Sequence, residues 1–466
     1  MRFLQICQIL LKYTVFYKFT KYRKEIFGKR LRLAFGELGL TFIKIGQILS
    51  MRYDLLSYED CKELQQLLDN VNPIPFEGIV KIVETEYGKP WHEVFAMLYS
   101  EPLGSASVSQ VHKAELFDGT KVAVKVKRPG VDDKFLADIK ILKRLALFAS
   151  FLSSTLRRIQ IKELVGYFES WLKQDLDFVL EAKSIKEIKE QYNFGATNFR
   201  HDLGKGIFIA PFENLCTSNV IVMDFIDGIP MSRKEEILAN PDYDIEKSIK
   251  TYVSAALRNW FRNDISTHLF QADPHLSNIL ALPNGDAANI DCGLICRLSK
   301  KEIQLSKDLI IAVYLQDTER VIKIATDMTG VSYKKYAPII RPDIEDYLQR
   351  TREEGFGFWF LEFAKLMVKN KIKFPLYLTT FGRTNLVLDG LVNTYMPEKT
   401  TLDILGEELR REAIKETFKN IADIDWLRVV YSVSEKAKQT PELISKLMDN
   451  PLGLISEIAK AAKVTP

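Results

Sequence analysis

The sequence predicts an α+β fold in which a small, sheet-rich lobe precedes a larger, mostly helical lobe. The first observation is that short β-rich runs gather in the first half of the chain, at 108–111, 122–126, 206–209 and 220–225. The second is that apolar residues recur at helical spacing in most of the chain beyond Asp227-Gly228, for example over 309–314, 359–368 and 374–395.

Composition and charge restrict the class of protein. The 466 residues allow two or three domains, and 47% apolar with 27% charged residues is typical of a folded soluble protein. A net charge of only +4 argues against general nucleic-acid binding. The five scattered cysteines favour neither a disulfide framework nor a zinc site. We therefore expect a reducing compartment, either the cytoplasm or the interior of an organelle.

The first 32 residues combine many Lys and Arg residues with aromatic and aliphatic ones, against a single acid, Glu25. This pattern is typical of an amphipathic helix on an anionic membrane, and equally of a helix packed on its own domain. No apolar stretch reaches the ~18 residues that span a bilayer. The sequence thus predicts no transmembrane segment, and any membrane contact is expected to be peripheral.

The remaining elements follow in order. Helical periodicity over 33–98 ends at Pro102 and Gly104, and Asp118-Gly119 joins two β-rich runs as a hairpin. Helices return over 131–192, and a second hairpin lies at Pro283-Asn-Gly-Asp. This order divides the chain into a basic segment, a helical extension, a sheet-rich lobe with inserted helices and a helical lobe: 1–32, 33–101, 102–226 and 227–466.

Several polar residues occur in an order that phosphate chemistry requires. Lys125 lies in the middle of the β-branched run Val122-Ala-Val-Lys-Val, after a stretch of small residues that would let a backbone turn approach a polyphosphate. Downstream, Asp273 and Asn278 are five residues apart, and Asp291-Cys-Gly follows thirteen residues later. A kinase site needs a strand lysine, an acceptor-orienting Asp, and an Asn and an Asp on the metal.

At these residues the chain resembles the UbiB/AarF-domain (ABC1-type) atypical kinases. Their KxGQ motif is present as Lys44-Ile-Gly-Gln47, their alanine-rich nucleotide loop resembles Ser105-Ala-Ser-Val-Ser, and their strand-lysine motif resembles Val122-Ala-Val-Lys-Val-Lys-Arg-Pro-Gly. The resemblance runs from about Gly36 to Leu298. It implies a bilobal protein-kinase-like fold with an added N-terminal helical extension, and ATP with Mg²⁺ as cofactors.

The resemblance also implies a role for each matching residue. Lys125 would hold the α and β phosphates, Asp273 would be the catalytic aspartate, and Lys44 and Gln47 would project into the site from the added helices. The metal ligands would be Asn278 and Asp291. The remaining nucleotide contacts would come from the loop residues and from the backbone of the hinge, namely Gly104, Ser105, Ala106, Ser107 and Asp224 to Ile226.

The chain departs from the family pattern at several positions. Three acids, Asp175, Asp177 and Glu181, are candidates for the partner of Lys125, with Asp175 standing where the family has Glu. Which of them pairs with Lys125 stays open at this stage. Cys292 replaces the Phe of Asp-Phe-Gly and is expected to be a small buried filler. No Ala-Pro-Glu follows Asp291, and in the family the extension covers the peptide groove, so a protein substrate is disfavoured.

Three functions remain in competition. The leading one is an ATP- and Mg²⁺-dependent kinase-like enzyme or ATPase that supports isoprenoid-quinone or other prenyl-lipid metabolism at a membrane surface, as the resemblance implies. Its partners would be a nucleotide, a prenyl-lipid or quinone precursor and a complex of biosynthetic enzymes, but no nucleic acid. The second is a pseudokinase scaffold that binds nucleotide and organises lipid-biosynthetic enzymes. The third is a small-molecule kinase, which would not require the Lys44-x-Gly-Gln47 motif.

Overall fold

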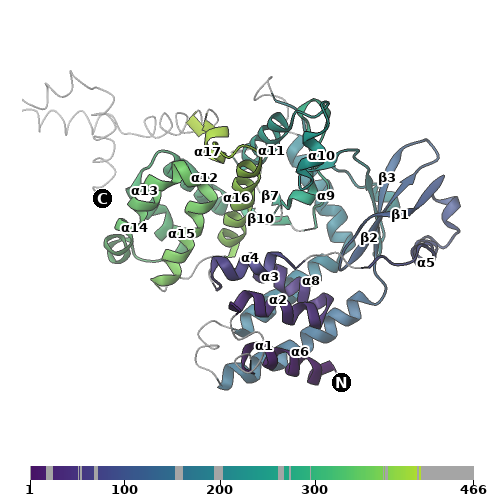
Figure 1. The fold of residues 1–466 in the computed structure, drawn as a ribbon, viewed down its shortest axis with the longest axis horizontal. Helices are drawn as coiled ribbons and strands as arrows, with labels where there is room; N and C mark the ends of the chain where they lie inside the picture. The colour runs from purple at the N-terminus through teal and green to yellow at the C-terminus, as the bar shows by residue number, and fades with distance from the viewer. Residues whose placement is uncertain are drawn as a thin grey trace, which may run out of the picture. The chain divides into compact units, whose positions relative to one another are not determined.

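The computed structural model of the chain describes most of the first 410 residues. The described residues are 2–16, 25–50, 52, 55–67, 72–152, 161–193, 203–260, 267–271, 274–293, 295–370, 372, 376–406 and 409–410. All elements below belong to the compact unit Met1–Ile404 (Figure 1).

Helices precede the first strand of the described chain, as the sequence predicts. They are α1 (Arg2–Thr14), α2 (Phe27–Leu38), α3 (Leu40–Leu49), α4 (Tyr58–Gln65) and α5 (Phe76–Tyr87). Helix α1 buries Ile6, Ile9 and Tyr13, and it packs on α2. The guanidinium of Arg2 donates to both carboxylate oxygens of Asp138, at 2.8 and 2.7 Å. The amphipathic N-terminal helix is therefore packed on its own domain, although its opposite face remains exposed.

The first lobe contains an antiparallel four-stranded sheet in the order β1-β2-β3-β5. Its strands are β1 (Met97–Ser105), β2 (Ser109–Glu115), β3 (Lys121–Lys127) and β5 (Val220–Asp224). Along β3 the side chains of Val122, Val124 and Val126 are fully buried in one apolar cluster. Since alternate residues of a strand face opposite sides, Lys125 points to the other side of the sheet. The predicted hairpin is present, with Gly119 at φ 84°.

Strand β1 differs from the sequence prediction. The sequence predicts helical structure to about residue 98 and the start of the sheet-rich lobe at residue 102. Strand β1 instead begins at Met97 and runs through both positions. The strand is irregular, with register shifts on either side of Pro102. An edge strand tolerates proline, because a position that faces away from the neighbouring strand needs no N–H donor. The register shifts interrupt the alternation of buried and exposed side chains by which a strand is recognised in a sequence.

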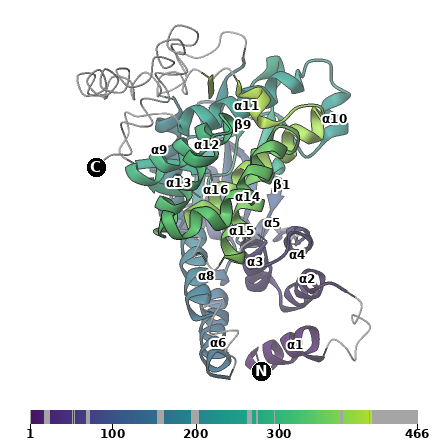
Figure 2. The same cartoon turned by 90° about the vertical axis from the view of Figure 1, so that its left-hand side faces the viewer.

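Among the described residues between β3 and β5 there are three α-helices: α6 (Val131–Leu152), α8 (Ile161–Leu176) and α9 (Phe178–Asn193). Helices α6 and α8 pack side by side, and Figure 2 shows them extending away from the sheets toward α1. A short break at Asp177 separates α8 from α9. Helix α9 turns back to the core, where Ile185 and Ile188 are fully buried.

Two small sheets of the second lobe pack on helix α11 (Ile245–Trp260). A four-stranded sheet has the order β4 (Gly206–Phe208), β9 (Ala287–Asn289), β8 (Ile279–Ala281) and β6 (Ile229–Pro230), and β10 (Ile295–Ser299) pairs with β7 (Thr267–Gln271). The predicted second hairpin joins β8 to β9, with Asn284 at φ 63° and Gly285 at φ 78°. These short strands hold the loops that carry Asn278 and Asp291.

The rest of the second lobe is helical, as predicted, in the residues that the structure describes. Its helices are α10 (Lys234–Leu238), α11 (Ile245–Trp260), α12 (Lys300–Tyr314), α13 (Thr318–Thr329), α14 (Tyr333–Glu354), α15 (Phe356–Lys369), α16 (Leu376–Tyr395) and α17 (Thr401–Ile404). Helices α15 and α16 approach closely, because a Cβ at Gly357 would lie 2.4 Å from the backbone of Leu386. Within the part of the chain that the structure describes, no helix is long and apolar enough to cross a bilayer.

A buried carboxylate on α16 binds the N-terminal ends of α15 and α17. Asp389 on α16 accepts a hydrogen bond from the N–H of Gly357 at 2.5 Å, in the first turn of α15. It also accepts from the hydroxyl and the N–H of Thr401, at the start of α17. Burial raises the pKa of Asp389 to about 6, although these donors oppose the shift.

This pKa predicts a pH dependence of folding stability. Between pH ~4 and ~6 the folded state holds a proton on Asp389 that the unfolded chain has released, because an unfolded aspartate titrates near pH ~3.9. The contribution of Asp389 to the free energy of unfolding should therefore fall by about 3 kcal/mol as pH rises through this window, and level off above it. Urea unfolding at several pH values measures this slope.

The control variants isolate the group. Asp389→Asn should remove this part of the slope, whereas Asp403→Asn should retain it, because the exposed Asp403 carboxylate only accepts from Thr400 at the start of α17. Two results would contradict the prediction. One is a pH dependence of the free energy of unfolding that is the same in Asp389→Asn and in the unsubstituted protein. The other is a free energy of unfolding that falls more steeply with pH in Asp389→Asn than in the unsubstituted protein.

Candidate functional site

The lysine of β3 lies at the centre of the candidate site. Lys125 is in register with Val111 on β2 and Ile221 on β5, so the sheet holds its backbone on both sides. Its ammonium lies 2.6 Å from Oε1 of Glu181, with side-chain exposures of 16% and 4% for the two residues. The ring of Phe178 lies below the same ammonium, at 5.4 Å from its centroid. The lysine is thus held in one position by an acid and an aromatic ring.

The electrostatics of this pair are set by burial and by further acids. Burial alone would lower the pKa of Lys125, but the charges of Glu181, Asp291 and Asp175 outweigh it and hold this pKa above its ordinary value. Burial raises the pKa of Glu181, and the charge of Lys125 opposes that shift. Lys125 therefore remains a cation in the site.

The three candidate acids have three different positions. Glu181, in the first turn of α9, is the partner of Lys125. Asp175, near the end of α8, instead pairs with Lys44 of the KxGQ motif, at 3.1 Å. Asp177 is exposed in the break between the helices, where its carboxylate accepts from the N–H of Leu180 at 2.9 Å and begins α9. The break at Asp177 turns these acids in different directions.

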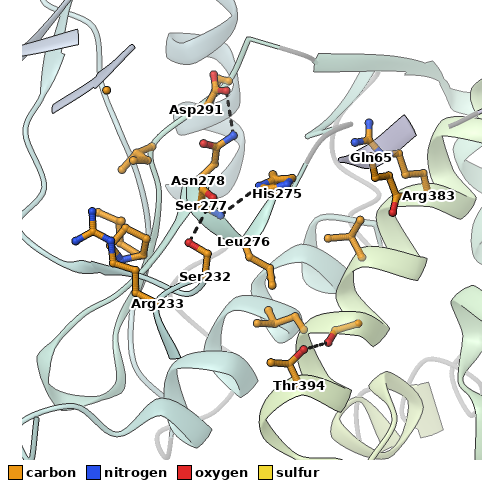
Figure 3. A pocket seen from close by; sticks show the side chains of 18 of the residues that line it. Gln65, Ser232, Arg233, His275, Leu276, Ser277, Asn278, Asp291, Arg383 and Thr394 are labelled. Carbon is orange, nitrogen blue, oxygen red and sulfur yellow. Dashed lines mark hydrogen bonds between the residues drawn. The ribbon is translucent and has the colours of Figure 1, made fainter. Parts of the chain in front are cut away.

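The predicted metal ligands are adjacent to each other. The side-chain amide of Asn278 donates to Oδ2 of Asp291 at 3.1 Å, and the N–H of Gly293 donates to Oδ1 of the same carboxylate at 2.8 Å (Figure 3). A Cβ at Gly293 would lie 3.2 Å from Asp291 Oδ1 and 3.7 Å from Glu181 Oε1, so both carboxylates border the same space. Cys292 is buried beside them, as predicted, and burial raises the pKa of its thiol.

The loop that the sequence predicts to be catalytic is described only in part. Asp273, the predicted catalytic aspartate, lies outside the described residues, as does Ala272. On one side of it, Gln271 ends β7 and donates from its side chain to the carbonyl of Asp291 at 2.5 Å. On the other side, His275 accepts from the N–H of Ser277, and Asn278 follows in the same short helix.

The small-residue loop between β1 and β2 is tightly turned. The N–H of Ala106 donates to the carbonyl of Ser109 at 2.8 Å. Gly104, Ser105 and Ala106 line a cavity, whereas Ser107 is fully buried and is not among its lining residues. Ser107 is thus placed where its side chain would not contact a ligand in that cavity.

Arg128 fixes this loop, a role that the sequence analysis missed. Its guanidinium donates to the carbonyl of Ala106 at 2.7 Å and to the hydroxyl of Ser105 at 2.6 Å. A third bond, at 3.1 Å, runs to the carbonyl of Asn72. The only sequence signal was the position of Arg128 directly after the lysine strand.

The predicted hinge also reaches the cavity. Asp224 and Ile226 are among the lining residues, and Met223 precedes them. The N–H of Asp224 donates to the carbonyl of Ala210 at 2.9 Å, and its carboxylate accepts from Lys189 at 2.9 Å. This N–H is already used, so an adenine ring would have to bond with other backbone groups of the hinge.

The KxGQ motif is held against the site by its glycine. A Cβ at Gly46 would lie 2.2 Å from the Leu67 side chain and 2.8 Å from Phe35, so only glycine allows this approach. Gln47 donates to the carbonyl of Leu67 at 3.3 Å. Lys44 and Gln47 both line the cavity from α3.

One cavity of about 1500 Å³ joins these groups. It brings together most of the predicted residues, but not Ser107, Asp175 or Asp177. The predicted residues that line it are Lys44, Gln47, Gly104, Ser105, Ala106, Lys125, Glu181, Asp224, Ile226, Asn278 and Asp291. The cavity also extends along α16, a region that the sequence analysis treated only as the floor of the lobe. Its sole signal there was an arginine, Arg383, in an apolar helix.

Comparison with known proteins identifies a family and a fold. Residues 66–325, more than half of the chain, match the model of the ABC1 atypical kinase-like domain. A solved structure of Rv3197 from Mycobacterium tuberculosis in complex with erythromycin superposes with a TM-score of 0.50 and 22% identity, covering 78% of this chain and 90% of that one. These two findings confirm the predicted α+β, bilobal kinase-like fold.

Curated relatives match nearly the whole chain. An uncharacterized protein in the hydrogenase 1 5′ region of Clostridium pasteurianum is 30% identical over 440 residues, 93% of this chain and 79% of the relative. The "Probable protein kinase UbiB" of Pseudomonas aeruginosa is 29% identical, covering 90% and 78%. The chloroplastic "Protein ACTIVITY OF BC1 COMPLEX KINASE 1" of Arabidopsis thaliana is 28% identical, covering 94% and 66%.

The buried pair predicts strong energetic coupling between Lys125 and Glu181. Either Lys125→Met or Glu181→Leu alone leaves an unpaired buried charge and should lower the free energy of unfolding by about 3 kcal/mol. The double variant should lose less than the sum of the two, because neither charge is left alone. Urea unfolding of the four proteins in a double-mutant cycle measures the coupling.

The matched control is the exposed pair of Lys186 and Glu213, whose side chains are half exposed. The same two substitutions there should show a much smaller coupling than at Lys125 and Glu181, because solvent screens the pair. Equal coupling in the two cycles, or strict additivity at Lys125 and Glu181, would show that this ion pair is not buried as described.

Proposed function

Because this chain belongs to the ABC1 atypical kinase-like family, we propose that it is an atypical kinase or ATPase. It transfers the γ-phosphoryl group of ATP, in a Mg²⁺-dependent reaction, to a small acceptor or to water. The observation that carries the proposal is that one cavity joins Lys125 and Glu181 with Asn278 and Asp291. Phosphoryl transfer needs positive charge and alignment more than covalent help, and these residues are suited to both.

In this proposal each group of residues in the cavity has its own role. Lys125 binds the α and β phosphates, because Glu181 holds its ammonium at the wall of the cavity. The loop from Gly104 to Ala106 covers the phosphates, with Arg128 fixing its backbone. Asp273, two residues after β7 and five before Asn278 in the chain, orients the acceptor hydroxyl and accepts its proton.

The donor set fits Mg²⁺. The carboxylate of Asp291 and the side-chain oxygen of Asn278 are hard oxygen ligands of the kind that this ion takes, and Gly293 orients the carboxylate. Asp291 and Asn278 would hold the ion, which when bound neutralises charge on the β and γ phosphates.

A small acceptor is favoured over a protein. Helices α3 and α4 of the extension supply Lys44, Gln47 and Gln65 to the lining of the cavity. An acceptor therefore shares the cavity with the extension. A place in isoprenoid-quinone or prenyl-lipid metabolism is what the family resemblance implies for such an acceptor.

Exposed apolar side chains support a role at a membrane surface. Leu4 on α1 is 62% exposed, and Phe151 at the end of α6 is 82% exposed. Lys140 and Arg144 are exposed on the same helix α6. Apolar side chains beside cations are the pattern that binds an anionic lipid surface.

Substitutions in the catalytic loop test the enzymatic function. Asp273→Asn should lower ATP consumption by about 100-fold or more while nucleotide affinity stays within about twofold, because the residue acts on the proton and not on the phosphates. Asp291→Asn should weaken Mg²⁺-dependent nucleotide binding. Release of ADP or of a phosphorylated acceptor, and nucleotide titration, are the measurements.

The matched control is Asp177→Asn, the same chemical change at an exposed helix cap, which should leave ATP consumption unchanged because asparagine caps a helix equally well. An unaltered rate in Asp273→Asn would remove the assignment. Nucleotide binding with no turnover in the unsubstituted protein would favour the scaffold function instead.

Flotation with vesicles tests the membrane surface. Leu4→Glu and Phe151→Glu should each reduce the bound fraction on phosphatidylglycerol-containing vesicles several-fold, because each buries a charge in the lipid interface. The matched control is Leu238→Glu on α10, since Leu238 is 61% exposed, about as much as Leu4. Equal losses in all three variants, or equal binding to vesicles that lack the anionic lipid, would contradict this role.

A further inference from the structure

Two buried amide side chains lie behind the candidate metal site. Asn289 at the end of β9 is fully buried, and Gln271 at the end of β7 is only 5% exposed. Neither is among the described residues that line the cavity. A buried amide is costly unless its oxygen and its N–H groups find hydrogen-bond partners. The partners of these two amides therefore indicate their role.

The two amides and the backbone of Asp291 form a closed ring of hydrogen bonds. The N–H of Asp291 donates to Oδ1 of Asn289 at 3.1 Å. The side-chain amide of Asn289 donates to Oε1 of Gln271. The side-chain amide of Gln271 in turn donates to the carbonyl of Asp291 at 2.5 Å. We call these three residues, Gln271, Asn289 and Asp291, the amide ring.

The amide ring is anchored to a sheet and to two helices. Asn289 belongs to β9, which lies between β4 and β8 in its sheet. The amide of Asn289 also donates to the hydroxyl of Tyr252 on α11, at 3.2 Å. The backbone carbonyl of Gln271 accepts from the hydroxyl of Thr384 on α16, at 3.3 Å. The ring is therefore attached to the core of the second lobe on three sides.

This ring fixes the backbone on both sides of the Asp291 Cα. The bonded N–H belongs to the peptide group before this atom, and the bonded carbonyl belongs to the peptide group after it. Because a peptide group is planar, holding both groups fixes both backbone dihedral angles of Asp291. These angles set the direction in which its side chain leaves the backbone. The amide ring thus aims the Asp291 carboxylate.

The carboxylate itself points to the other predicted metal ligand. It accepts from the side-chain amide of Asn278 at 3.1 Å and from the N–H of Gly293 at 2.8 Å (Figure 3). The carbonyl of Asn278 accepts from the N–H of Ile290 at 3.0 Å, so the β8–β9 hairpin keeps the two predicted ligands opposite each other. The amide ring holds only backbone groups of Asp291. It therefore leaves the carboxylate oxygens to a metal ion.

We propose that Gln271 and Asn289 are positioning residues for the metal ion, and that they set the affinity of the Asp291 carboxylate for it. This inference rests on the proposed function, because it concerns the metal ion of the same site. A metal ligand must be held within about 0.5 Å of its productive position. Loss of a residue that orients a ligand typically costs about 10-fold to 100-fold in metal affinity. We expect a loss of that size when the amide ring is opened.

Gln271→Met opens the ring with little change in side-chain volume. Methionine has no N–H for the carbonyl of Asp291, and only a weakly accepting sulfur for the amide of Asn289. The matched control is Gln191→Met on α9. Gln191 is 7% exposed, and its amide makes two hydrogen bonds to the backbone of Leu269 on β7, at 2.7 and 3.0 Å. Both substitutions remove a buried amide that binds backbone groups, but only Gln271→Met opens the ring.

The experiment titrates the full-length protein with Mn²⁺ alone, without nucleotide, and follows the free ion by electron paramagnetic resonance. Mn²⁺ takes the same oxygen ligands as Mg²⁺. The ion of interest is the one whose binding is lost in Asp291→Asn. Gln271→Met should weaken the binding of this ion at least about tenfold, whereas Gln191→Met should leave it within about twofold. Both variants should lower the midpoint of urea unfolding, because each removes hydrogen bonds to the backbone.

Two results overturn the inference. One is an affinity for Mn²⁺ in Gln271→Met that equals that of the unsubstituted protein or of Gln191→Met. The other is the absence of a Mn²⁺ ion that depends on Asp291. Gln271→Asn, whose amide is one methylene too short to close the ring, repeats the test against Gln191→Asn should a methionine variant fail to fold. Failure of the proposed function is distinguishable, because it appears as Mn²⁺ binding at Asp291 without binding or turnover of ATP.

Discussion

The burial of the Lys125 ammonium is the constraint on which the site depends. A cation at the wall of a cavity must be balanced by nearby negative charge, and here Glu181, Asp291 and Asp175 supply it from three separate segments. Lys44 adds a second cation, opposite Asp175. Two ammonium groups against three carboxylates leave one negative charge in excess. A site with that excess favours a divalent cation together with a polyphosphate over the polyphosphate alone.

Close packing, rather than charge, places the helices that form the other walls of the cavity around Lys125. Gly46 lets α3 lie directly against Leu67 and Phe35, so that Lys44 and Gln47 reach the cavity. In the second lobe, Gly357 brings α15 onto the backbone of α16. Without side chains at these two positions, both helices can stand closer to their neighbours than a Cβ would permit. The cavity is therefore lined by helices of the N-terminal extension and of the second lobe.

The strand position of Lys125, the proximity of Asn278 to Asp291 and the two hairpins were predictable, because each depends on local signals that survive in one sequence. The partner of Lys125 was not. Asp175, Asp177 and Glu181 are separated by a helix break, and the break decides which acid faces the lysine. Strand β1 was hidden by the bulges around Pro102. The extension of the cavity along α16 was not predictable, because the helical pattern of this segment does not tell a cavity-lining face from one that packs on the core.

The hydrogen bonds of Arg128 couple two parts of the site mechanically. Arg128 directly follows β3, the strand of Lys125, while its guanidinium holds the carbonyl of Ala106 and the hydroxyl of Ser105. The loop and the lysine are in this way attached to one rigid piece of backbone. Movement of this loop away from the sheet would break both hydrogen bonds of Arg128, so the position of the loop at the cavity should depend on the position of strand β3.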